Sequence, residues 1–293
     1  MAYHSLKEII DYCDKKKVSF FQAVLDDDME ERKVSKEESM AQMYAMWDAM
    51  LLASTTYDGS LISASGLTGR QGAQMEEYRK SGKTLCGDFI SQVVVQALEM
   101  GESNACMKRI VAAPTAGSCG VLPAVLIPYY RMYQEECDNI HQAVIESLYV
   151  AAGIGQVIAS RAFIAGAAGG CQAEIGAASS MAAGALVSLK GGDQRQICHA
   201  SAIAMKNLLG LVCDPVAGLV EVPCVKRNVT GAVNALTAAD MALAGITSAI
   251  PADQVFDAMR EVGEKMHISL KETGEGGLAA TPEGIRITKS LVM

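Results

Sequence analysis

The chain has 293 residues and a formal net charge of −8 at pH 7; 50% of its residues are hydrophobic but only 5% are aromatic. This length allows a large hydrophobic core without disulfides or structural metals, and the negative charge without a basic stripe excludes a nucleic-acid-binding surface. Alanine and glycine are the most frequent of the small and apolar residues, which favours closely packed helices over β-sheets.

The first strong helix signal is the sequence Ser35-Lys36-Glu37-Glu38, which is typical of a capping box at the N-terminus of a helix. Apolar residues then recur at helical spacing, namely Met40, Met43, Met46, Trp47, Met50 and Leu51. We interpret this stripe as a helix face in the core. An adaptable docking surface is the alternative, because flexible methionine side chains suit both roles.

Further helical patterns follow along the chain, and no regular alternation of strand and helix appears. They predict helices over residues 89–100, 121–134, 139–154, 172–189, 193–208, 229–244 and 253–266. The predicted fold is therefore mainly α, a compact multi-helix domain.

The segments between these helices are rich in glycine, proline and small residues. They span residues 63–72, 113–120, 166–170, 214–223 and 273–280. Glycine lets a backbone turn sharply or approach a ligand closely, so these segments are predicted to be active-site loops.

Residues 1–60 are the most charged part of the chain and are predicted to form an N-terminal helical extension. Residues 61–293 are predicted to form the catalytic helical domain. The composition changes gradually between the two, so one continuous domain is the alternative.

We expect neither a signal peptide nor a membrane span. Residues 1–17 lack a continuous apolar segment. The longest tract of small apolar residues, 150–189, is interrupted by polar and charged side chains, namely Gln156, Arg161, Gln172 and Glu174. A cytoplasmic protein without a membrane partner is the expectation.

The chain has nine cysteines, an odd number, and we expect it in a reducing compartment. Disulfides are therefore a poor interpretation of these cysteines. Cys213 and Cys224 flank a loop with two prolines and a glycine, and Cys171 directly follows the glycine-rich segment 166–170. This spacing matches neither a zinc ribbon nor a ferredoxin. Buried thiols and a shared metal site both remain open on spacing alone.

The segment Thr115, Ala116, Gly117, Ser118 leads directly into the helix predicted from Val121. Its amides and hydroxyls could receive a carboxylate at that helix N-terminus. An amino-acid substrate would fit such a site.

Three other motifs point to different chemistry. Residues 81–84 resemble the end of a P-loop, but Glu77 stands where that pattern requires glycine, which excludes a nucleotide phosphate site. Residues 116–120 differ from the G-x-S-x-G pattern of serine hydrolases only at Ala116. Lys190, followed by Gly191 and Gly192, is the one faint candidate for a pyridoxal phosphate lysine.

The longest loop and cysteine motifs resemble the α chain of iron–sulfur-dependent L-serine dehydratases. The resemblance extends over roughly residues 63–282 and is carried by residues 65–69, 112–118, 167–176, 207–218, 222–228 and 272–279. It implies that Cys171, Cys213 and Cys224 are the three ligands of a [4Fe-4S] cluster, with one iron left open as a Lewis acid.

The resemblance also implies a reaction and a partner. L-Serine would lose water at the open iron and yield pyruvate and ammonia. A serine-rich motif of the family's β part is absent here, so the chain resembles the α chain of the two-chain form, and a β subunit is implied in an αβ heterodimer or a larger assembly. The alternatives are a non-enzymatic iron–sulfur sensor or assembly module and a pyridoxal-phosphate amino-acid dehydratase.

We expect the substrate carboxylate at Thr115, Ala116, Gly117 and Ser118, with the segment of Ser65, Thr68 and Gly69 as a second candidate. The base that removes the α-proton is not identified by the sequence. His199 and Lys206 are candidates, since seven residues place them on one face of the predicted helix. Arg227 is a candidate bidentate carboxylate site.

Overall fold

The computed structural model describes residues 3–292, and every regular element in that range is a helix, which confirms the mainly α prediction. The α-helices are α1 Leu6–Lys16, α2 Phe20–Arg32, α3 Lys36–Thr55, α4 Gln71–Lys80, α5 Gly87–Ala105, α6 Val121–Tyr133, α7 Ile140–Arg161, α8 Gly166–Gly169, α9 Ala177–Leu189, α10 Gln194–Lys206, α11 Cys224–Leu243, α12 Ala252–Lys265 and α13 Pro282–Val292. Single helical turns complete the set: η1 Gln172–Gly176, η2 Val216–Gly218, η3 Ile268–Leu270 and η4 Gly277–Ala280.

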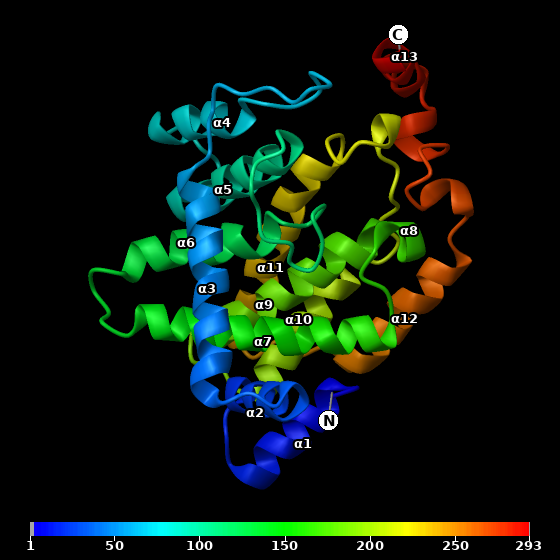
Figure 1. Cartoon of the computed structure of the whole chain (residues 1–293). Coiled ribbons are helices and arrows are strands. Elements are labelled where there is room, and N and C mark those ends of the chain that lie inside the picture. The colour runs from blue at the N-terminus through cyan, green and yellow to red at the C-terminus, as the bar shows by residue number, and fades with distance from the viewer. Residues whose placement is uncertain (1–2, 293) are drawn as a thin grey trace.

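Helix α9 lies at the centre of the molecule, with α7, α10 and α11 packed around it (Figure 1). Small residues make this close packing possible. A Cβ on Gly184 would stand 2.2 Å from Cδ1 of Ile154 on α7, so only glycine lets these two helices approach so closely. The hydroxyls of Ser179 and Ser180 donate hydrogen bonds to the carbonyls of Gly231 and Ser201, at 2.8 and 2.7 Å.

Helix α7 is long and apolar enough to cross a membrane by length and composition alone. Within the protein, 61% of its apolar window is buried, and the helix packs against α2 and α9. This is the environment of a core helix in a helical bundle.

The predicted helices are confirmed, with shifted ends. Ser35 and Glu38 form the predicted capping box at the start of α3. The methionine stripe that follows is divided: Met50 is buried beside Trp47, whereas Met46 is exposed. Helix α11 begins at Cys224 rather than at residue 229, so this cysteine lies in the first turn of a helix.

The three N-terminal helices pack on the main bundle. Leu6, Ile9 and Trp47 are buried in the same apolar cluster as the residues of α7 and α9. The boundary predicted at residue 60 falls in the loop between α3 and α4.

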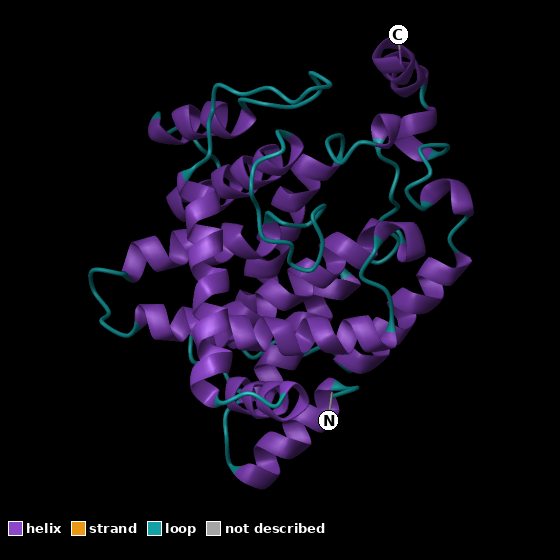
Figure 2. Cartoon of the chain, viewed as in Figure 1, coloured by secondary structure: helices purple, strands orange, loops and turns teal. Residues whose placement is uncertain are grey.

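The longer loops lie mostly in the upper half of the view in Figure 2, away from α1 and α2. Two of them are joined by backbone hydrogen bonds. The amide of Cys213 donates to the carbonyl of Leu270 at 2.8 Å, and the amide of Glu272 donates to the carbonyl of Cys213 at 2.7 Å. Loops remote in sequence therefore meet at one end of the bundle.

Glu99 on α5 offers a test of this packing through pH. Burial raises the pKa of Glu99 to about 7, and the nearby Arg131 opposes the shift. A carboxyl whose folded pKa exceeds its unfolded value contributes stability that is fully present below about pH 4 and is lost as pH rises through about 7.

The free energy of unfolding of the parent chain should therefore fall between pH 5 and pH 8 by an amount on the order of 2 kcal/mol. We expect Glu99→Gln to abolish this fall. Urea unfolding at both pH values measures this difference. Glu77→Gln, at an exposed position on α4, is the control and should keep the pH dependence of the parent. Equal pH dependence in Glu99→Gln and the parent would contradict the prediction.

Candidate active site

Cys171 stands at the junction between a tight turn and the π-helical turn η1, which leads into α9. Gly170 has φ +79°, and a Cβ there would stand 2.9 Å from the carbonyl oxygen of Leu211, so the turn requires glycine. Gln172 is fully buried, and its side-chain oxygen accepts a hydrogen bond from the amide of Gly210 at 2.9 Å. This bond holds the Cys171 turn against the segment that leads to Cys213.

Cys213 is buried and is bonded through its backbone to the segment around Leu270, as described above. The next residue, Asp214, accepts hydrogen bonds from Arg227 at 2.8 Å and from the amide of Leu278 at 2.8 Å. One buried carboxylate therefore ties three segments together around Cys213.

Cys224 begins α11 and is connected to the predicted substrate loop by one side chain. The amide nitrogen of Asn228 donates to the carbonyls of Cys224 at 3.0 Å and Gly117 at 2.9 Å. Its oxygen accepts from the amide of Gly120 at 2.9 Å. Asn228 is buried and thus fixes residues 117–120 next to the first turn of α11.

The three thiols share one electrostatic environment. Burial raises the pKa of Cys171 to about 11 and that of Cys224 to about 12, and Arg227 opposes both shifts. Burial also raises the pKa of Cys213, and the charges of Cys171, Glu174, Glu272 and Cys224 raise it further. The structure thus brings together the three predicted cysteines and two carboxylates that the sequence did not single out as site residues.

The predicted carboxylate loop has three unused amides. The backbone amide of Thr115 donates a hydrogen bond to the hydroxyl of Ser118 at 3.3 Å. Within the described part of the chain, the amides of Ala116, Gly117 and Ser118 donate no hydrogen bond. They lie immediately before α6, where free amides favour an anion.

Glu174 lies between this loop and the thiols. The hydroxyl of Thr115 donates to Oε1 of Glu174 at 2.7 Å. A Cβ on Gly117 would stand 3.0 Å from Oε1, and one on Gly166 would stand 3.0 Å from Oε2 and 2.8 Å from Sγ of Cys213. Burial raises the pKa of Glu174, and the Thr115 hydrogen bond opposes the shift.

The second predicted substrate segment is bonded within the chain. The hydroxyl of Ser65 donates to Glu221 at 2.6 Å, Thr68 accepts from the side chain of Gln71 at 3.2 Å, and both predicted residues thus have protein partners. Gly69 has φ +141°, and a Cβ there would stand 2.5 Å from the carbonyl oxygen of Leu61. This segment is thereby held against Glu221.

The structure places the candidate base His199 outside this group. His199 accepts a hydrogen bond from the amide of Ser248 at 3.2 Å and lines a cavity of about 730 Å³ between α1, α10 and α12. That lining includes none of the three cysteines of the site. Lys206 lies at the C-terminal end of α10. Arg227 donates to the carbonyl of Val212 and to Asp214, so its guanidinium is already engaged by the protein.

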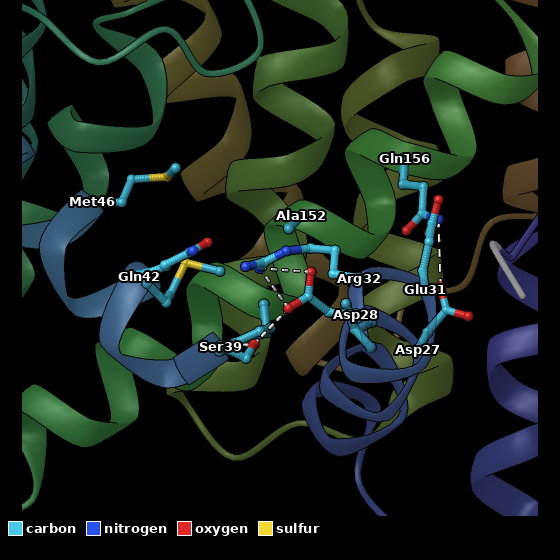
Figure 3. Close-up of a pocket in the computed structure, with 12 residues that line it drawn as sticks. Asp27, Asp28, Glu31, Arg32, Ser39, Gln42, Met46, Ala152 and Gln156 are labelled. Carbon is cyan, nitrogen blue, oxygen red and sulfur yellow. Dashed lines mark hydrogen bonds and ion pairs between the residues drawn. The ribbon is translucent and has the colours of Figure 1, made fainter. Parts of the chain in front are cut away.

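Another cavity, of about 220 Å³, lies between α2, α3 and α7 (Figure 3). Arg32 and Ser39 both point toward Asp28, with bonds of 2.9 and 2.6 Å to its carboxylate. None of the residues predicted for the site lines this cavity.

Sequence reasoning assigned no role to Glu174, Glu272 or Asn228. Glu174 is a polar interruption of a small-residue tract and lies in a motif quoted for the family resemblance; a carboxylate in such an apolar tract is the signal that could have found it. Glu272 has φ +65°, a conformation uncommon outside glycine, which the sequence does not reveal. Asn228 falls in a motif already quoted for the family resemblance, but its partners come from remote segments.

In the described range, fold and site together define an all-helical protein whose loops enclose three buried thiols next to two carboxylates. Residues 15–279 match the family model described as serine dehydratase alpha chain. The chain belongs to this family.

Individual relatives agree with that assignment. The chain is 46% identical over 289 residues to a Bacillus subtilis protein named probable L-serine dehydratase, alpha chain, covering 99% of this chain and 95% of the relative. It is 41% identical over 290 residues to the L-serine dehydratase alpha chain of Peptoniphilus asaccharolyticus, covering 99% and 98%. It is also 36% identical over 285 residues to L-serine dehydratase TdcG of Escherichia coli, covering 94% of this chain but 61% of that protein.

Proposed function

We propose that this chain is the catalytic α subunit of an L-serine dehydratase that converts L-serine to pyruvate and ammonia. The proposal assigns Cys171, Cys213 and Cys224 to a [4Fe-4S] cluster. The observation that supports it is that these three thiols come from separate segments, are all buried, and lie near enough for Cys171 and Cys224 to raise the pKa of Cys213. The names of the relatives supply the reaction.

The donor set fits an iron–sulfur group. Buried thiolates are the soft ligands that such clusters use. Gly166 leaves the space next to Sγ of Cys213 unfilled, because a Cβ there would stand 2.8 Å from the sulfur. Within residues 3–292, no three His, Cys, Asp or Glu side chains are grouped closely enough for a single metal ion. Each thiolate of a cluster binds a different iron, so a cluster does not require its cysteines to be grouped as closely as the ligands of a single metal ion.

Cys171, Cys213 and Cys224 would hold the cluster, which would supply a Lewis acid for the serine hydroxyl. The chain itself binds and orients the substrate. The free amides of Ala116, Gly117 and Ser118 would hold its carboxylate at the start of α6. Asn228 keeps these amides in register with the turn of Cys224, which fixes the substrate relative to the thiols.

We further propose a β subunit as partner, in an αβ heterodimer or a larger assembly, and a cytoplasmic location. Two relatives matched over nearly their full length carry the name alpha chain, and the matched region covers only 61% of the relative TdcG. The nine cysteines are all unpaired, which suits a reducing compartment.

The alternative chemistries find less support in the geometry. Lys190 is followed by Gly191 with φ +76°, and the carboxylate of Asp193 already accepts from the first amides of α10, so no free helix N-terminus is left for a phosphate. Ser118 is fully buried, and its hydroxyl bonds within its own loop rather than to His199. A measurement of L-serine turnover distinguishes the enzyme from a non-enzymatic iron–sulfur sensor.

The test is anaerobic purification of the α chain together with its β subunit, followed by assays of L-serine turnover. Brown protein that forms pyruvate, and loses this activity in air, supports the proposal. Activity that survives air and iron chelation but is lost to carbonyl reagents would favour pyridoxal phosphate. A brown complex without activity would favour the sensor.

A further inference from the structure

Glu174 is a carboxylate without a cationic partner near the thiols of Cys213 and Cys224. Thr115 is the only donor of a hydrogen bond to this carboxylate in the described residues. Neither Glu174 nor Glu272 forms an ion pair among these residues, and the nearby guanidinium of Arg227 is bound to Asp214. Carboxylates held inside a protein are normally paired with a cation.

The free amides lie next to this carboxylate. A Cβ on Gly117 would stand 3.0 Å from Oε1 of Glu174, and the amide of Gly117 is one of the three without a partner. A negative group and a row of free amides thus occupy adjacent positions, with Sγ of Cys213 on the other side of the carboxylate. An α-amino acid carries the complementary charges on a single carbon atom.

We propose that Glu174 binds the α-ammonium group of the substrate and so selects amino acids over hydroxy acids. The inference rests on the proposed function and deepens it, because it explains how the chain distinguishes L-serine from a similar molecule without nitrogen. Thr115 holds the carboxylate in position through its hydrogen bond to Oε1. The other oxygen, Oε2, lies near Gly166, where a Cβ would stand 3.0 Å from Oε2 and 2.8 Å from Sγ of Cys213.

The experiment compares the anaerobic αβ holoenzyme with its Glu174→Gln variant, which has nearly the same shape but no charge. The probes are L-serine as substrate, L-glycerate as an inhibitor in which a hydroxyl replaces the ammonium, and L-alanine, which has no leaving group, in calorimetric binding. We expect the KM for L-serine and the Kd for L-alanine to rise roughly 10- to 150-fold, as for loss of a charged hydrogen bond. The Ki for L-glycerate and the iron content should stay the same.

Glu99→Gln is the matched control, since Glu99 is a similarly buried carboxyl on α5 with a raised pKa. It should leave all four quantities unchanged. A second variant, Glu174→Asp, keeps the charge but withdraws it by one methylene. It should raise the KM for L-serine and not the Ki for L-glycerate, which keeps the proposal testable if Glu174→Gln does not fold.

Three results would overturn the inference. A lower kcat with an unchanged KM would make Glu174 a proton-transfer residue. Loss of iron in Glu174→Gln would make it a cluster ligand. Equal weakening of L-serine and L-glycerate would indicate a structural role. Failure of the proposed function is separate: the unchanged enzyme would not turn over L-serine, while binding of L-alanine would still decide the role of Glu174.

Discussion

Replacement of Cys171, Cys213 or Cys224 by serine, one at a time, is expected to remove most of the bound iron and to lower L-serine turnover by more than about 100-fold. Even residues that only support a metal ligand cost 10- to 100-fold when changed, so loss of a ligand itself should cost more. Iron per chain, visible absorption and pyruvate formation, all measured anaerobically on the αβ complex, provide the readout.

The best control is Cys119→Ser. Cys119 is fully buried, lies in the loop next to the site, and has a pKa that burial raises to about 12, yet its thiol faces the carbonyl of Met100 at 3.7 Å. It should keep its iron, as should variants at the remaining positions, Cys13, Cys86, Cys106, Cys137 and Cys198. Full iron content after any one of the three ligand changes would refute the cluster assignment.

Local sequence signals predicted the elements but not their meeting points. The capping box of Ser35 and Glu38 depends on residues three apart, and it forms as predicted. The glycine at position 170 similarly marks a turn that no residue with a side chain could make. Such features could be predicted because each is decided within a few residues of the chain.

The neighbours of the site residues depend on contacts between remote segments. The Cys213 segment lies against the carbonyl of Leu270, and Asn228 connects α11 with the carbonyl of Gly117. His199 lies on a helix face that seemed suitable for catalysis, but packing of α10 against α1 and α12 turns that face toward a different cavity. Helical periodicity indicates that a face is buried, not which other segment covers it.

Asp214→Ala is expected to be the most destabilising of the polar substitutions near the site, by about 3–5 kcal/mol. The change would leave the largely buried Arg227 without its ion-pair partner and the amide of Leu278 without its acceptor. It would also loosen residues 273–280, because this loop is held by the same carboxylate. Urea unfolding measures the free energy, and limited proteolysis reports on the loop.

The destabilisation by Asp214→Ala should come from loss of the buried Asp214–Arg227 ion pair, and not merely from loss of a charged side chain. Arg286→Ala removes an ion pair with Glu283 that is exposed on both sides, and no measurable loss of stability is expected. Asp214→Asn should fall between the two, because an amide oxygen can still accept from Leu278 but does not neutralise Arg227. If Asp214→Ala were as stable as Arg286→Ala, Asp214 would not be what holds the loops of Cys213 and Leu278 together.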